Sequence, residues 1–276
     1  MAPLAPILAL LAMSMATVAI EVVPMDMAPN AFDDRYQGCR DKMAAMLPVL
    51  KSVEFQQNSL FAPAWAQATA EWQNRGSPVS PLLFPDQAIA IMAYTMSTTF
   101  SEKFLDAVHE AGHSRQQYRD NFHFKTLHFL LTDALAKLKD NQCRDVYRVG
   151  HNTRLEAQRG QRVRFGWFLW MSLSDAVPTE YESGTLLQVH TCHGVDIRKF
   201  SFNPRTQMVL TPPYEIFEVT QASQDGDKTQ IQLRSTGTHS NYTCEWLRGG
   251  SSPRDTPMLR GLLLATAALA VATGIF

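Results

Sequence analysis

Two short stretches of this 276-residue chain carry side chains that could do chemistry. His190-Thr191-Cys192-His193 offers two imidazoles and one thiol, which are common zinc ligands, but three ligands do not close a tetrahedral site. Glu180-Tyr181-Glu182 places two carboxylates two residues apart, and we interpret it as a solvated loop, because carboxylates are mostly exposed. Four further histidines have no acidic partner at ligand spacing, and we expect them to be structural: His109, His113, His123 and His128. The sequence therefore predicts no metal site.

The elements that would position these side chains differ between the two halves of the chain. Apolar residues recur at helical spacing in the first half, which predicts helices near 34–47, 52–74, 86–96, 100–110 and 115–138. Short runs bounded by Gly, Asn and Pro predict strands in the second half, at 146–149, 162–168, 185–190, 208–210, 215–220 and 228–235. The sum is one α+β domain, in which a helical N-terminal lobe (about 30–140) packs on a mostly antiparallel β core (about 143–247).

A double proline fixes the sharpest corner of the predicted β core. Pro212-Pro213 follows the apolar run Met208–Leu210, and the extended run Tyr214–Val219 departs from it. Two consecutive prolines fit neither a helix interior nor a central strand, so the chain must turn there. Asp225-Gly226 is a strong hairpin signal further on.

Composition and the two chain ends indicate an exported protein. A net charge of −1 with 18% charged residues gives no basic face for nucleic acid. Residues 1–20 are uncharged and apolar, which is typical of a secretory signal peptide, with a buried N-terminal helix as the alternative. Small residues at Gly249–Ser252, a polar spacer and an apolar tail predict that 251–276 is a removable GPI-anchor signal. The alternative is a membrane-spanning helix, for which the tail is short.

The four cysteines agree with export. Their even number predicts disulfides in an oxidising compartment, and the sequence by itself permits three pairings of Cys39, Cys143, Cys192 and Cys244. Asn241-Tyr242-Thr243 is a glycosylation sequon, which predicts an exposed, glycosylated Asn241. Together these features predict a domain over 21–250 in the secretory pathway.

Several motifs resemble the vertebrate ecto-ADP-ribosyltransferases, cell-surface enzymes that use NAD+ to modify arginine. The resemblance covers most of the chain and is carried by NAFDDRYQGC (30–39), AYT (93–95), FHFKTLHFLLTDAL (122–135), CRDVYR (143–148), RFGWF (164–168), TCHGVDI (191–197), VLTPPYEIFEV (209–219) and STGTHSNYTC (235–244). It implies an ADP-ribosyltransferase-like fold and a cleft in the β core where NAD+ binds as a substrate. No G-x-G-x-x-G turn occurs, as expected for this mode of binding.

The resemblance implies a role for each of several residues. Arg148 matches the arginine whose guanidinium holds dinucleotide phosphate through charge-assisted hydrogen bonds. Ser172 matches the second serine of a Ser-x-Ser motif. Three further positions, Tyr94, Trp167 and Ser201, match or border family residues that contact NAD+.

Other positions depart from the family pattern. Counting back from the double proline, the catalytic glutamate falls on Met208 and its upstream partner on Thr206. Trp170 occupies the position of the first serine. A thioether cannot supply the negative charge that stabilises the oxocarbenium-like centre as nicotinamide leaves. Two hypotheses follow: a mono-ADP-ribosyltransferase that moves ADP-ribose from NAD+ to protein arginine, or a catalytically inactive surface member of the family that serves as a binding or antigenic module.

The resemblance also implies the remaining features of the protein. It implies the disulfides Cys39–Cys244 and Cys143–Cys192 and a GPI anchor at the outer cell surface. The expected partners are NAD+, an acceptor arginine if the chain is active, and the membrane through the lipid anchor. The expected state is a monomer without metal or nucleic acid.

Overall fold

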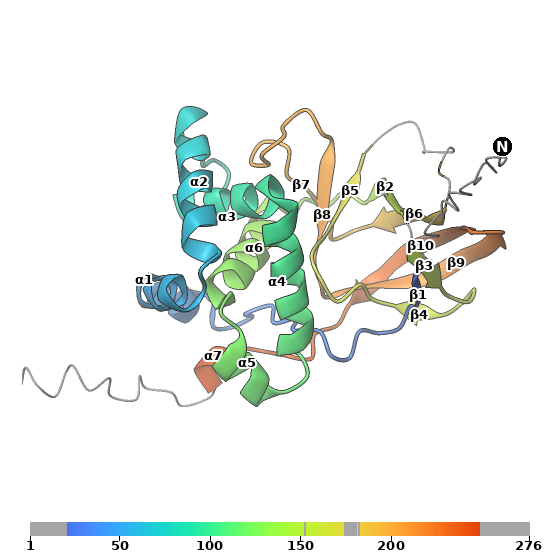
Figure 1. The fold of residues 1–276 in the computed structure, drawn as a ribbon, viewed down its shortest axis with the longest axis horizontal. Coiled ribbons are helices and arrows are strands. Elements are labelled where there is room, and N and C mark those ends of the chain that lie inside the picture. The colour runs from blue at the N-terminus through green and yellow to red at the C-terminus, as the bar shows by residue number, and fades with distance from the viewer. Residues whose placement is uncertain (1–20, 152, 174–180, 182, 249–276) are drawn as a thin grey trace, which may run out of the picture.

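The computed structural model describes residues 21–151, 153–173, 181 and 183–248. The predicted signal peptide, the predicted anchor signal, Glu180 and Glu182 lie outside these residues. Helices gather on one side of the molecule and strands on the other (Figure 1), so the predicted α+β fold with an N-terminal helical lobe is confirmed. Within the described part of the chain, no helix combines the length and apolar character needed to cross a membrane.

The helical lobe differs from the prediction at its first boundary. It contains α1 (Arg40–Gln57), α2 (Phe61–Asn74), α3 (Pro85–Met96), α4 (Thr98–Ala111), α5 (Arg115–Asn121) and α6 (Lys125–Leu138). The predicted break between 47 and 52 is wrong, because α1 continues through Pro48 and buries Met43, Leu47 and Leu50. The helix ends instead before Asn58, whose side-chain amide donates to the His123 carbonyl at 3.2 Å.

The predicted single helix over 115–138 is two helices, α5 and α6. The carboxylate of Glu54 in α1 accepts hydrogen bonds from the backbone N–H groups of Lys125 (2.5 Å) and Thr126 (2.9 Å). These are two of the N–H groups that every helix leaves unpaired at its N-terminus, so Glu54 sets the start of α6 from another helix. Burial is the main cause that raises the pKa of Glu54, and the hydrogen bonds from Thr126 oppose it.

The strands form an eight-stranded sheet with the order β4-β9-β10-β6-β2-β5-β8-β7. Its members are β2 (Arg144–Gly150), β4 (Arg162–Val163), β5 (Leu169–Ser172), β6 (Gly184–Thr191), β7 (Val195–Asp196), β8 (Met208–Thr211), β9 (Glu215–Asp225) and β10 (Lys228–Thr238). Only β10 and β6 run parallel in this sheet, so the mostly antiparallel core is confirmed. The strands β1 (Glu21–Pro24) and β3 (Thr153–Glu156) pair separately and in parallel.

The corner and the hairpin lie where the sequence places them. β8 ends at Thr211 and β9 begins at Glu215, with the double proline between them. Asp225 pairs with Lys228 across the β9–β10 turn, where Gly226 adopts a left-handed φ of 56°. The predicted strand 162–168 is shorter, because only Arg162–Val163 pairs with β9. Strands β1, β3, β5 and β7 were not predicted.

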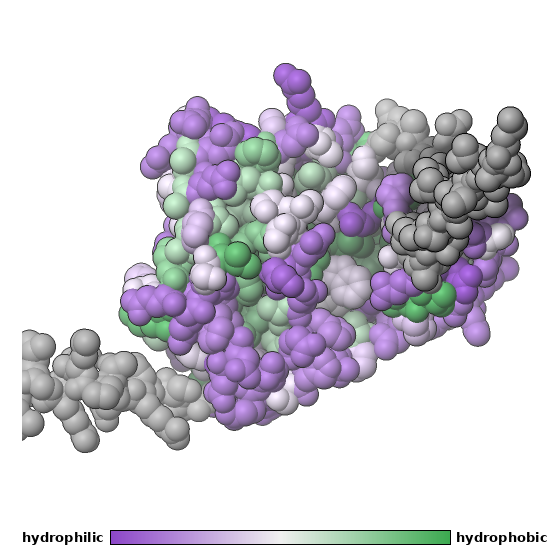
Figure 2. All heavy atoms as spheres, in the orientation of Figure 1, coloured by the Kyte–Doolittle hydropathy of each residue, from purple (hydrophilic) through white to green (hydrophobic). Residues whose placement is uncertain are grey.

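Two apolar clusters form the core, and one of them joins the two halves. One fills the helical lobe and extends to Phe168, Phe200, Met208 and Leu210 of the β half. The other lies among the strands and includes Val209. Because side chains alternate along a strand, Met208 and Leu210 pack toward the helices while Val209 packs away from them. Hydrophilic side chains cover much of the outer surface, including the edge over α5 (Figure 2).

His128 is a buried histidine at the centre of the helical lobe, which agrees with its predicted structural role. Its Nε2–H donates to the Phe32 carbonyl (3.1 Å), so its Nδ1 accepts from the Tyr36 hydroxyl (2.8 Å). Burial lowers the pKa of His128 from 6.5 to about 3, against the opposing effect of the Phe32 carbonyl. The imidazole is therefore neutral in the folded protein above that pH.

This burial predicts a pH-dependent stability. Between pH about 6.5 and about 3 the unfolded chain binds a proton at His128 that the folded chain excludes, so the free energy of unfolding falls as pH falls. We expect a contribution of about 1.4 kcal/mol per pH unit. The His128→Gln variant should show a shallower dependence in denaturant titrations from pH 7 to 4. His113→Gln, which changes a half-exposed histidine, is the control, and equal slopes for all three proteins would contradict the prediction.

Candidate functional site

Strand register brings the predicted site residues together. β5 lies between β2 and β8 in the sheet. Tyr147 of β2 pairs with Ser172 of β5, and Ser172 in turn pairs with Met208 of β8. Trp170, two residues before Ser172, pairs with Leu210. Arg148 follows Tyr147, so the residues matched to the family's arginine, serine and glutamate lie on three adjacent strands.

Arg148 makes both of its described contacts with Trp170. Its Nη1 donates to the Trp170 carbonyl at 3.0 Å, and its guanidinium carbon lies 4.4 Å from the centroid of the indole ring. The indole itself is 39% exposed. Burial of the guanidinium lowers the pKa of Arg148. The Arg148 cation is partly desolvated and contacts a carbonyl and a ring face, but no carboxylate is among its described contacts. An anionic ligand would therefore bind it favourably.

Met208 presents sulfur where the resemblance places the catalytic glutamate. Its side chain is only 9% exposed and belongs to the apolar cluster of the helical lobe. Thr206 lies in the loop before β8, where its backbone N–H donates to the Asn203 carbonyl at 3.2 Å. A thioether is a weak acceptor and carries no charge, so this strand end cannot stabilise a cation as a carboxylate would.

No acidic residue occurs in the sequence from Ala157 through Ser174 or from Ile197 through Tyr214, which are the segments that contain β5 and β8. The acids that flank the second segment are engaged elsewhere. Asp196 pairs with Arg198 at 2.5 Å. The Glu215 carboxylate accepts from the Thr191 hydroxyl (2.6 Å) and from backbone N–H groups of the 192–193 turn. Glu215 is fully buried, and burial is the main cause that raises its pKa.

Tyr94 and Ser201 are buried rather than displayed on a surface. The Tyr94 hydroxyl donates to the Phe168 carbonyl at 2.7 Å, one residue before β5. Burial raises the pKa of Tyr94, against the opposing charge of Arg148. The Ser201 hydroxyl donates to backbone carbonyls of Arg198 and Asn203. Both side chains therefore support the backbone beside the site. Trp167 is half-buried and packs near Phe165.

The loop that leads into β8 is held by two residues that were not among the predicted site residues, Arg75 and Thr95. Arg75 at the end of α2 donates to the Ser201 carbonyl at 2.7 Å and also to the Phe202 carbonyl. The Thr95 hydroxyl accepts from the Phe202 backbone N–H at 2.8 Å. Thr95 lies within the AYT motif, which is the one signal that pointed to it. These contacts join the helical lobe to the loop that places Met208.

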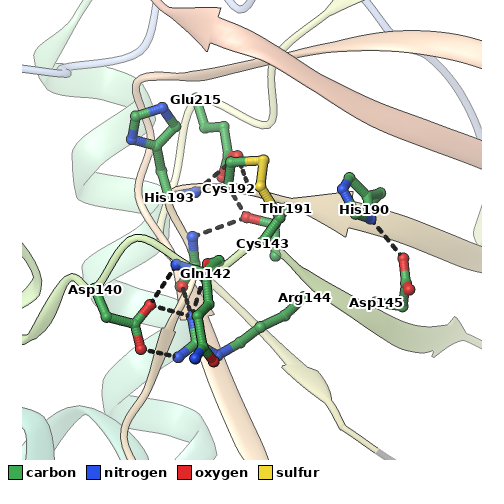
Figure 3. The surroundings of a disulfide bond; sticks show 11 residues. Asp140, Gln142, Cys143, Arg144, Asp145, His190, Thr191, Cys192, His193 and Glu215 are labelled. Carbon is green, nitrogen blue, oxygen red and sulfur yellow. Dashed lines mark hydrogen bonds and ion pairs between the residues drawn. A yellow bond between two sulfur atoms is a disulfide. The ribbon is translucent and has the colours of Figure 1, made fainter.

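Both implied disulfides are present, Cys39–Cys244 and Cys143–Cys192. The first joins residues 205 positions apart and closes the domain. The second joins the start of β2 to the end of β6, close to Glu215 (Figure 3). Because Cys192 is oxidised, the His190-Thr191-Cys192-His193 stretch offers no thiolate to a metal in this form of the protein.

A helical lobe beside this sheet, with the three-strand site at their junction, defines an ADP-ribosyltransferase-like domain. The crystal structure of the eukaryotic mono-ADP-ribosyltransferase ART2.2 has the same fold, with a TM-score of 0.70 and 34% identity over 80% of this chain and 98% of that one. The family model described as NAD:arginine ADP-ribosyltransferase matches residues 25–241, so the chain belongs to this family of transferases.

Named relatives agree with this assignment. The NAD(P)(+)–arginine ADP-ribosyltransferase 2 of Gallus gallus is 46% identical over 234 residues, 83% of this chain and 75% of that protein. The GPI-linked NAD(P)(+)–arginine ADP-ribosyltransferase 1 of Mus musculus is 42% identical over 239 residues, 82% of this chain and 74% of that protein. ART2.2 variants with one glutamate replaced by alanine or isoleucine have been solved with NADH and NAD, at TM-scores of 0.70 and 0.69 and 34% and 36% identity, each over 80% of this chain and 98% of that one.

Proposed function

We propose that this protein is a cell-surface arginine ADP-ribosyltransferase by family that binds NAD(P)+ at the β2–β5–β8 site but has lost the transfer step. One observation carries the proposal: Met208 pairs directly with Ser172, at the position that the resemblance gives to the catalytic glutamate. The second candidate is the family reaction itself, transfer of ADP-ribose from NAD+ to protein arginine. Family membership favours that candidate.

Dinucleotide binding rests on the residues that are retained. Arg148 supplies a desolvated cation for the pyrophosphate, and Ser172 supplies a hydroxyl on the neighbouring strand. The indole of Trp167 offers a ring face for stacking, whereas the indole of Trp170 lies against the Arg148 guanidinium. Tyr94 and Ser201 act indirectly, by holding the backbone on either side. Two variants of ART2.2, each with one glutamate replaced, were solved with NADH and NAD, which supports dinucleotide binding in this fold when a glutamate is missing.

Calorimetric titration with NAD+ and a transfer assay test the two parts separately. We expect the protein to bind NAD+ and the Arg148→Ala variant to bind it at least tenfold more weakly, because a charge-assisted contact is lost. Labelled NAD+ and a small guanidinium acceptor should give no transfer above background. Arg205→Ala, which removes an exposed arginine before β8, is the matched control for charge. Transfer by the unmodified protein would establish the family reaction instead.

The proposed location is the outer cell surface, through cleavage of residues 1–20 and replacement of 251–276 by a GPI anchor. Two disulfides and the GPI-linked relatives support this proposal, as does the exposed Asn241 of the sequon. Expressed on cells, the full chain should be released by a phosphatidylinositol-specific phospholipase. Retention on the membrane after that treatment would contradict the anchor. Sedimentation of the released domain checks the proposed monomer.

A further inference from the structure

The Cys143–Cys192 disulfide lies in a group of side chains that share one face of the sheet. Arg144 pairs with Thr191, and Asp145 pairs with His190. Cys143 precedes the first pair on β2 and Cys192 follows it on β6, so the two cysteines are opposite each other. Because side chains alternate along a strand, both cysteines and the Asp145–His190 pair project to the same side (Figure 3).

These side chains have the composition and spacing of a zinc site. One ligand atom each from Cys143, His190 and Cys192 lies within 4.8 Å of the others. Ligand atoms around a tetrahedral zinc ion are about 3.5–4 Å apart, so the two sulfur atoms, which are bonded to each other in this structure, would separate on reduction while the imidazole already lies within reach. His190 Nδ1 lies 2.7 Å from an Asp145 carboxylate oxygen, and its Nε2 has no hydrogen-bond partner among the described residues. A carboxylate on one imidazole nitrogen is the usual support for a metal on the other.

The group is accessible from outside. Cys143 is exposed and the His190 side chain is 43% exposed. The same face continues into a solvent-accessible hollow lined by Asp145, Tyr147, Gln188, His190, Gln232 and Arg234. In the other disulfide Cys39 is buried, at 7% exposure, and Cys244 is half-buried, so neither is as exposed as Cys143. An external thiol therefore reaches Cys143 first.

We propose that reduction of Cys143–Cys192 converts this disulfide into a zinc site formed by Cys143, Cys192 and His190, with water as the fourth ligand. The reductant is a low-molecular-weight thiol. Its thiolate attacks the Cys143 sulfur, forms a mixed disulfide and releases Cys192 as a thiolate; a second thiol then releases Cys143 and leaves as the external disulfide. Two electrons pass to the protein, and two thiolates with one neutral imidazole bind Zn2+.

The site is independent of NAD+ binding, because it uses none of the residues assigned to the dinucleotide. The zinc site also gives the Asp145–His190 pair a role, which is to orient a metal ligand. In the oxidised form the pair is a surface contact with little effect on stability. In the reduced form Asp145 would orient the imidazole toward the metal.

Cobalt, which reports tetrahedral thiolate ligation by its visible absorption, is the probe. The folded domain is treated with a water-soluble phosphine until alkylation and intact mass show two free cysteines. It is then desalted without oxygen and titrated with Co2+, and Zn2+ is added to displace the bound Co2+. We expect one equivalent to bind after reduction and none before. His190→Ala should weaken binding at least tenfold, and Asp145→Asn should weaken it as well.

His193→Ala is the matched control, since it removes the neighbouring imidazole that lies outside the group. It should leave the affinity for Co2+ unchanged. Circular dichroism accompanies each titration, to show that the reduced domain is folded with metal. No thiolate absorption after reduction, equal affinity in His190→Ala and the unmodified protein, or unfolding on reduction that metal does not reverse would each overturn the proposal.

Discussion

The Thr206→Glu/Met208→Glu double variant is expected to transfer ADP-ribose from NAD+ to a small guanidinium acceptor at least ~10²-fold faster than the unmodified protein. A carboxylate at position 208 on β8 would lie opposite Ser172 on β5. β5 in turn pairs with β2, which contains Arg148. There the carboxylate would stabilise the oxocarbenium-like centre as nicotinamide leaves. The carboxylate at position 206 would orient and deprotonate the acceptor guanidinium. Release of labelled nicotinamide and labelling of the acceptor measure the two halves of the reaction.

We expect a third change, Trp170→Ser, to increase the rate further. In the double variant the glutamate at position 208 is buried, and burial raises the pKa of its carboxyl group and so favours the neutral form. The indole at 170 also holds the Arg148 guanidinium by a contact of about 0.5–2 kcal/mol, and a serine there would free that cation for phosphate. We therefore expect the triple variant to exceed the double variant in rate and to bind NAD+ more tightly than the unmodified protein.

Two control variants separate catalysis from added charge. Gln207→Glu introduces the same carboxylate between the two sites, on an exposed side chain rather than a buried one. Met208→Gln keeps the length of glutamate without its charge. Neither should transfer ADP-ribose. If Gln207→Glu matched the double variant, the placement of the site on β8 would be wrong; thermal unfolding shows that each variant is folded.

Local signals predicted two turns of the β half better than they predicted the breaks between helices. The double-proline corner and the Asp225-Gly226 hairpin depend on backbone preferences of the residues themselves, and both were confirmed. The C-terminal end of α1 and the N-terminal start of α6 depend on partners far along the chain. Asn58 bonds to the carbonyl of residue 123, and Glu54 caps α6 from 71 residues away. Periodicity contains no information about such contacts, so it placed the breaks wrongly.

The candidate site shows a similar division. The resemblance to the family was enough to select Arg148, Ser172 and Met208, which the sheet brings to adjacent strands. It could not indicate that the Arg148 guanidinium lies on the ring of Trp170, because that contact depends on side-chain conformation. Nor could it select Arg75, whose role comes from carbonyls more than 120 residues away. Residue identity predicts which chemistry is possible, and tertiary contacts decide which groups are free to perform it.

The Arg164→Ala variant is expected to lose about 3–5 kcal/mol of unfolding free energy, the largest stability effect that we predict. Arg164 and Asp33 are almost fully buried and form an ion pair at 2.5 Å. The same guanidinium donates to the carbonyls of Met27 (2.8 Å), Ala28 (3.1 Å) and His239 (2.7 Å). One side chain thus joins both ends of the described chain to the β half.

Removing the guanidinium leaves the Asp33 charge buried, with only the hydrogen bonds from the segment that begins at Ser240. Breaking a buried pair from one side costs far more than removing a surface charge. Arg162→Ala, two residues earlier on the exposed side of β4, should therefore change stability by less than about 0.5 kcal/mol. Guanidinium denaturation with both disulfides intact measures the two variants. Equal stabilities would show that the hydrogen bonds from 240–242 are enough to hold Asp33, since those contacts persist when Arg164 is removed.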